Sequence, residues 1–247
     1  MTEETNASES EVQITPVEAS VLLSGAEWDP KLLATTLARE WEITVPEKDL
    51  PADAAVKLFE EPLPAEMARM HAAMNPLWPQ AGAMAQLHRA HLAVAAIPKT
   101  ASLVEAAQVL VKVVSSLCNQ PSALAIDTGS TILGTDGYRE GATVMKGGEL
   151  PLFNLVTFAI AKADETNFVA FTMGMSFLGH NELEISPTAE KPEVIQEFLY
   201  TVASYTLKTG KGLRDGQILG LHPEKAQAVR YAESSMIPGL KTMQITL

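Results

Sequence analysis

The sequence predicts an α+β protein, with a ferredoxin-like split βαβ first half followed by a mostly antiparallel sheet that carries one covering helix. In the first half, strand and helix signals follow the order strand, helix, strand, strand, helix, strand. Residues 151–247 hold several β-rich segments but one long helical pattern. Since 47% of the residues are hydrophobic and 19% are charged, the chain can bury a core.

Turn and capping residues punctuate the first half. The apolar run 19–24 is followed by Asp29 and Pro30, an N-cap and a proline at the first helical position, so a strand leads into a helix. Ser102 and Glu105 have the spacing of a capping box, which opens a helix that ends near Leu117. The other elements that we expect here are strands at 54–60, 67–74, 91–97 and 123–126 and a short helix at 80–88.

The second half has the pattern of a sheet with a single helix. Residues 152–161 and 167–173 predict a hairpin. A helix is expected to begin at Pro192 and to end near Lys208, with Gly210 beyond it. The remaining β-segments are expected at 182–185, 217–221, 228–233 and 241–247.

Changes in composition divide the chain into four parts. Residues 1–18 are expected to be a disordered tail, because 1–13 are rich in Asn, Ser, Thr and Glu. Residues 136–150 are a Gly-rich connection with the turn dipeptides Asp136-Gly137 and Gly147-Gly148. The predicted units are therefore 19–135 and 151–247, and the second can pack as one unit with the first.

Charge and composition restrict the possible partners. Eighteen Lys and Arg against thirty Asp and Glu give a net charge of −12, which repels nucleic acid and suits a basic protein partner. We expect a cytoplasmic protein with no membrane role, because no apolar run is long enough to span a bilayer and the first residues lack signal-peptide features. The single cysteine, Cys118, lies among apolar residues and is expected to be a buried hydrophobe. The oligomeric state stays open.

Glu182 and Glu184 are the first candidates for chemistry. They alternate with Leu183 and Ile185, so both carboxylates lie on one strand face about 6 to 7 Å apart, a separation that glycoside chemistry uses. His180 precedes them, and Asp215 is a further acid that the fold could add. The alternative, which we favour, is that the two glutamates form the solvated face of an amphipathic strand.

Other motifs are incomplete. His88 and His91 could bind a metal on one helical turn, but they lie at a predicted helix-to-strand junction, and we expect no metal site. Residues 129–134 loosely resemble a phosphate loop but lack its Gly-Lys-Ser/Thr ending, so we expect no cofactor. Trp28 and Trp78 lie near prolines in loop-like segments, where an exposed indole could anchor a partner, although packing is the simpler expectation.

Several segments of the second half resemble a known family. These are 141–154, 164–166, 171–175, Gly179, 182–185 and 215–216. They resemble a bacterial domain-of-unknown-function family, number four-two-six-one, and residues 88–92 with the helix after Ser102 are similar to its upstream half. The resemblance implies kinship from about Ser20 to the end of the chain and implies no activity.

Two functional hypotheses follow from these observations. The first is a non-enzymatic protein-binding module, immunity- or adaptor-like, which rests on the acidic charge and on the incomplete catalytic motifs. The second is a hydrolase-type enzyme with a carboxylate-based site around Glu182 and Glu184.

Overall fold

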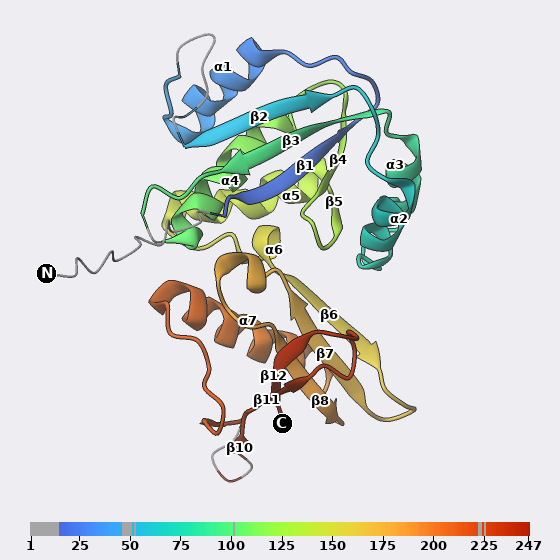
Figure 1. The fold of residues 1–247 in the computed structure, drawn as a ribbon, viewed down its shortest axis with the longest axis vertical. Coiled ribbons are helices and arrows are strands. Elements are labelled where there is room, and N and C mark those ends of the chain that lie inside the picture. The colour runs from blue at the N-terminus through green and yellow to red at the C-terminus, as the bar shows by residue number, and fades with distance from the viewer. Residues whose placement is uncertain (1–14, 46–50, 52, 101, 222–223, 225) are drawn as a thin grey trace, which may run out of the picture.

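The computed structural model describes residues 15–45, 51, 53–100, 102–221, 224 and 226–247 (Figure 1). This part of the chain contains two five-stranded sheets, one two-stranded sheet and seven α-helices. The predicted α+β class is confirmed. Most of the predicted tail, residues 1–14, lies outside the described residues, and residues 17 and 18 already belong to the first strand. None of the described helices combines the length and apolar character that a membrane span needs.

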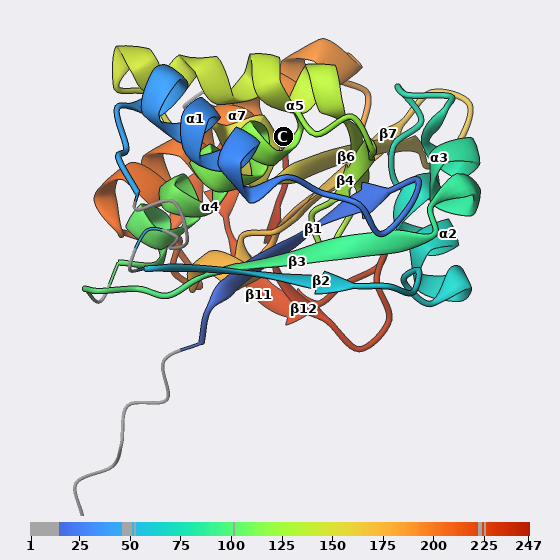
Figure 2. The same cartoon turned by 90° about the horizontal axis from the view of Figure 1, so that it is seen from above.

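The N-terminal sheet has the strand order β2-β3-β1-β4-β5, and every neighbouring pair is antiparallel. Its strands are β1 (Val17–Leu23), β2 (Ala54–Phe59), β3 (Ala90–Ala96), β4 (Ala123–Asp127) and β5 (Ile132–Gly134). Helices α1 (Pro30–Trp41) and α4 (Leu103–Leu117) lie on one side of this sheet, as Figure 2 shows from above. Alternate side chains of β1, beginning with Val17 and Ala19, are buried on that side.

Both long helices of this half begin where the capping residues predict. A side-chain oxygen of Asp29 accepts a hydrogen bond from the Lys31 backbone N–H at 2.8 Å. The Ser102 hydroxyl accepts one from the Glu105 N–H at 3.3 Å, but the Glu105 carboxylate accepts from Thr100, so the capping box is half formed.

The expected strand at 67–74 is wrong, because this segment forms helix α2 (Ala65–Ala73). Ala68 and Ala72, four residues apart, pack with Leu22 and Ala125, which fits a helical period and not a strand period. Helix α3 (Ala81–Leu87) follows as predicted. The order of elements therefore differs from the predicted one, because α2 and α3 both lie between β2 and β3, and α4 separates β3 from β4. The ferredoxin-like assignment stays a prediction.

Helices α2 and α3 cover one end of the second face of the N-terminal sheet. Their buried alanines form a small core with Leu22, Ala125 and Ile132. On the rest of that face Glu18, Ala55 and Lys57 are exposed, and Ala93 and Ala95 are half-buried. An antiparallel sheet can present one face to solvent, and here the uncovered part carries small and charged side chains.

The Gly-rich connection is largely helical. Residues Thr135–Ala142 form α5, so the expected turn at Asp136-Gly137 is wrong, and the 3₁₀ helix η1 (Thr143–Gly147) follows. Tyr138 of α5 is buried, and its burial offsets the poor helix propensity of the two glycines in this helix. The turn at Gly147-Gly148 is confirmed by a φ of 80° at Gly148.

The C-terminal sheet has the order β11-β12-β8-β7-β6, in which β12 and β8 are parallel and the other pairs are antiparallel. Its covering helix is α7 (Pro192–Thr209), which ends at Gly210 as predicted. The first residues of the expected strand 152–161 instead form the short helix α6 (Leu152–Leu155). The other elements are β6 (Thr157–Lys162), β7 (Phe168–Met173), η2 (Ser176–Leu178), β8 (Leu183–Thr188), β9 (Ile218–Leu219), β10 (Gln227–Ala228), β11 (Arg230–Glu233) and β12 (Lys241–Ile245).

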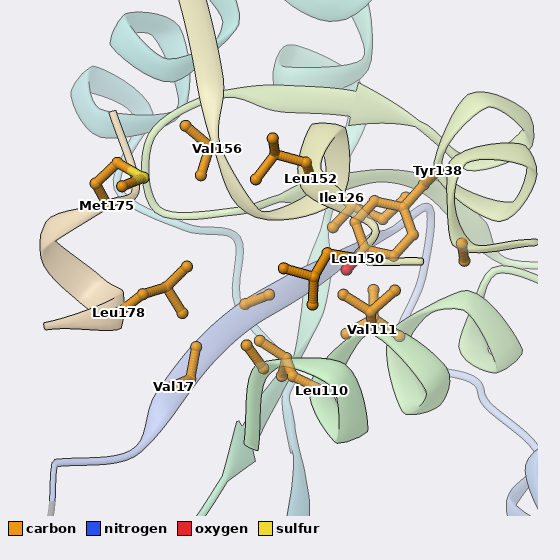
Figure 3. Close-up of a cluster of buried hydrophobic side chains, with 14 of the residues drawn as sticks. Val17, Leu110, Val111, Ile126, Tyr138, Leu150, Leu152, Val156, Met175 and Leu178 are labelled. Carbon is orange, nitrogen blue, oxygen red and sulfur yellow. The ribbon is translucent and has the colours of Figure 1, made fainter. Parts of the chain in front are cut away.

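One hydrophobic core joins the two sheets. Figure 3 shows Val17 of β1 and Leu110 of α4 beside Leu152 of α6 and Leu178 of η2. Cys118 lies in this core as predicted, and burial raises the pKa of its thiol. The side chains between the sheets therefore come from both halves of the chain.

Candidate functional site

Glu182 lies just before β8 and is only 3% exposed. Its carboxylate accepts five hydrogen bonds, from the Thr172 hydroxyl, the backbone N–H groups of Gly174, Met175 and Ser176, and the Ser176 hydroxyl. The distances range from 2.7 Å for Thr172 to 3.2 Å for Met175. The acid thus connects β8 to the segment that follows β7.

Glu184, 2% exposed, has a similar but separate set of donors. The hydroxyls of Ser234, Ser235 and Thr242 and the backbone N–H of Ser235 donate to its two oxygens at 2.6 to 3.0 Å. Burial raises the pKa of this carboxyl group, but the hydrogen bonds outweigh burial and hold the pKa below its ordinary value. Glu184 therefore stays ionised and connects β8 to the loop between β11 and β12.

The preference for a solvated pair of glutamates is wrong, because both side chains are buried. Strand alternation places them on one face, but loops 174–176 and 234–235 cover that face and supply the donors. Carboxylates with several backbone and hydroxyl donors can remain charged without a cation. Their lone pairs are used by the fold, which gives Glu182 and Glu184 a structural role.

His180 and Asp215 do not complete a site with these two acids. His180 lines a small cavity of about 120 Å³ with Leu213 and Met243, and burial lowers the pKa of its imidazole. Asp215 accepts a hydrogen bond from the Tyr231 N–H at 2.9 Å at the turn that Gly216 completes with a φ of 78°. Asp215 and Gly216 thus form the turn that the sequence predicts.

The two histidines at positions 88 and 91 are held by the backbone. The ring nitrogens of His88 contact the Leu63 N–H and the Ala85 carbonyl, and burial lowers the pKa of this imidazole. His91 Nδ1 donates to the Glu61 carbonyl, and the ring stacks on Phe59 at 4.8 Å between centroids. Among the described residues, no group of three His, Cys, Asp or Glu side chains is arranged to hold a metal.

An acid–imidazole pair that the sequence did not single out joins α2 to the end of β4. His71 Nδ1 lies 2.9 and 2.8 Å from the two oxygens of Asp127, whose side chain is 2% exposed. The two residues are 56 positions apart, and the segment of His71 was predicted as a strand. Finding this pair requires the pairing register of β1 and β4 and the helical form of α2, and the sequence pattern predicts neither.

Two exposed apolar side chains, Leu77 and Phe153, line a cavity of about 370 Å³ between the two halves. Leu77, in the loop between α2 and α3, is 88% exposed, and Phe153 of α6 is 56% exposed. Trp78 lies against Gly134, where an added Cβ would approach the indole to 3.1 Å. Trp78 is thus partly packed, while its neighbour Leu77 extends into solvent. We call Leu77, Trp78 and Phe153 the apolar surface.

Phe153 also belongs to an aromatic cluster. Its ring centroid lies 5.7 Å from that of Phe158 on β6 and 5.3 Å from that of Tyr200 on α7. Aromatic contacts at these distances stabilise a fixed ring position, so the exposed edge of Phe153 is held by the C-terminal sheet and its helix.

Comparison with known proteins found a family match within the second half of the chain. Residues 171–246 match a family model described as a domain of unknown function, DUF4261. The resemblance found in the sequence is thereby confirmed for these residues. The DUF4261 segment begins inside β7 and includes Glu182, Glu184 and all of their side-chain donors, whereas His71, Leu77 and Phe153 precede it. No curated protein and no solved structure matched the chain.

Proposed function

We propose that the protein is a non-enzymatic binding module, immunity- or adaptor-like, that holds a basic protein partner on the apolar surface. The observation that carries this proposal is the exposure of Leu77 and Phe153 beside a cavity that can receive a side chain of the partner. Apolar side chains that remain exposed at a hollow are typical of protein interfaces, where a few anchors supply most of the binding energy.

Charge supports the choice of a basic partner. The chain carries a net charge of −12, and the exposed carboxylate of Asp136 lines the same cavity. A partner with an apolar anchor and a neighbouring Lys or Arg would complement both features. Electrostatic attraction would raise the association rate and would weaken as salt is added.

The alternative, a hydrolase-type enzyme around Glu182 and Glu184, has less support from the geometry. Both carboxylates are buried and accept several hydrogen bonds from the protein itself. A general acid or a nucleophile must reach substrate atoms. We therefore assign the two acids to the stability of the DUF4261 segment.

The test compares single serine variants of the tagged full-length chain. Leu77→Ser should remove the stoichiometric partner that co-purifies with the wild-type protein, and with the purified partner it should weaken binding roughly tenfold or more. The matched control is Ile218→Ser, because Ile218 is similarly exposed, at 64%, but lies on β9. A partner that binds wild-type and Leu77→Ser equally well would contradict the proposed surface.

A further inference from the structure

A second groove lies on the uncovered part of the N-terminal sheet, against helix α2. It has a volume of about 310 Å³. The strand register places Lys57, Ala93, Ser20 and Asp127 side by side in one row across β2, β3, β1 and β4. Because neighbouring strands are about 4.8 Å apart, this row is roughly 14 Å long.

The floor of this groove is shallow because its side chains are small. Ala93 lies in the middle of the row, and Ala55 and Ala95 lie in the next row. Met67 of α2 and Leu63 form part of the wall. Methyl groups below and longer apolar chains at the side leave space for a flat body about the size of an aromatic ring.

One end of the row holds an oriented imidazole. Asp127 accepts from His71 Nδ1 at 2.9 and 2.8 Å and from the Gly129 N–H at 2.7 Å. A buried carboxylate that holds one ring nitrogen fixes the orientation of the ring and leaves Nε2 as its other hydrogen-bonding atom. His71 lines the groove, with 14% of its side chain exposed.

The other end holds a cation. The Lys57 ammonium lies 4.5 Å from the centroid of the Phe59 ring. Within the described part of the chain no carboxylate pairs with Lys57, although the protein has thirty acidic residues. Glu18 also lines the groove, but it lies opposite Ala95 in the neighbouring row.

We propose that this groove binds a small organic acid with a flat body. The carboxylate pairs with Lys57, the body lies on the alanine floor, and a polar group at the far end bonds to His71 Nε2. An ammonium held over an aromatic ring is already positioned for an anion, which lowers the conformational entropy lost on binding. The proposal does not depend on the apolar surface, which is formed by other residues.

The charge requirement is tested with benzoate and with benzamide, its neutral analogue of similar shape, by NMR titration of the full-length protein. Benzoate should bind with a millimolar Kd and roughly tenfold more tightly than benzamide. Lys57→Gln should abolish this preference. Lys162→Gln, which changes an exposed lysine of β6, should leave it unchanged. Equal binding of both probes to the wild-type protein would overturn the proposal.

The location is tested with two further changes. A 4-hydroxyl group on benzoate should tighten binding to the wild-type protein, and His71→Gln should remove that gain. Ala93→Leu should fill the middle of the row and reduce benzoate binding at least about tenfold. Circular dichroism shows whether each variant folds. If His71→Gln or Ala93→Leu fails to fold, benzoate binding by the remaining variant and by Lys57→Gln still tests the location of the site. Unchanged benzoate binding in folded Ala93→Leu would show that the probe binds elsewhere.

Discussion

At the scale of single residues, hydrogen bonds from the protein satisfy the carboxylate oxygens of both buried glutamates. Neither Glu182 nor Glu184 is paired with a cation in the described part of the chain. Backbone N–H groups and hydroxyls replace water around each carboxylate. Hydrogen bonds to an ionised carboxylate are shorter and stronger than neutral ones, so Glu184 stabilises the loop that surrounds it.

Glu184 makes stability depend on pH. Its pKa is lowered in the folded state, so its contribution is present above the unfolded-state pKa of about 4.3 and is lost as the pH falls through the folded-state pKa. Glu184→Gln should reduce the free energy of unfolding by about 1 to 3 kcal/mol at neutral pH, and by less under acid conditions. Urea denaturation from neutral pH downward measures this difference. Glu165→Gln, in the exposed β6–β7 turn, is the control, and a constant difference at every pH would contradict the assignment.

Gly174 is required by the loop around Glu182. Its φ is +122°, and an added Cβ would lie 2.3 Å from the Leu155 carbonyl oxygen. Gly174→Ala should therefore destabilise the protein by about 3 kcal/mol or more. Thermal denaturation checks this, with Gly147→Ala as the matched control because nothing lies within 4 Å of its added Cβ. Similar losses in both variants would contradict the steric explanation.

At the scale of elements, the helical form of α2 determines which of its side chains contact the second face of the N-terminal sheet. As a strand, residues 67–74 would point alternate side chains to opposite faces. As a helix, the segment buries Ala68 and Ala72 on the sheet and brings His71 to Asp127. One change of secondary structure therefore creates both the wall of the groove and its acid–imidazole pair.

The helical form of α2 can be tested at Arg69. This exposed residue lies in the middle of the helix and pairs with Glu66 at 2.6 Å. Arg69→Pro should cost about 3 kcal/mol because proline removes a helical hydrogen bond. Arg69→Ala should cost less than about 1 kcal/mol, since an exposed ion pair contributes little. Chemical denaturation of both variants compares them, and equal stabilities would argue against the helix.

At the scale of the whole molecule, the shared core bears on whether the halves are separate domains. The prediction of two units, 19–135 and 151–247, rests on the Gly-rich connection, yet helix α5 of that connection buries Tyr138 and Ala142 in the core. Leu178 of η2, 4% exposed, belongs to the same cluster as Leu110 of α4. Burial of this kind makes the stability of each half depend on the other.

We therefore expect the chain to unfold in one cooperative transition. Fragments 1–150 and 151–247 should not unfold cooperatively when they are made separately, because each would expose its part of the core. Leu178→Ala should destabilise the full chain by about 2 to 5 kcal/mol and should lower the melting temperature reported by both halves. Circular dichroism and calorimetry measure these transitions. Two independently melting fragments would instead support two domains.

The sequence by itself determined the elements whose signals are local. Asp29 with Pro30, Ser102 with Glu105, and Gly210 each act within one turn of their helix, and the structure has these ends where they were predicted. Composition and periodicity were sufficient for the α+β class. The family resemblance was stated on segments from 88–92 to 215–216, and the family match covers those that lie in residues 171–246.

Only the tertiary structure decided which side chains are buried and which ones meet. Strand alternation placed Glu182 and Glu184 on one face, but loops distant in sequence bury Glu184 through Ser234 and Ser235. The pairing of His71 with Asp127, and the position of Leu77 near Phe153, also depend on packing between separate elements. Burial and long-range pairing are properties of the packed chain, because they arise from contacts that no local pattern encodes.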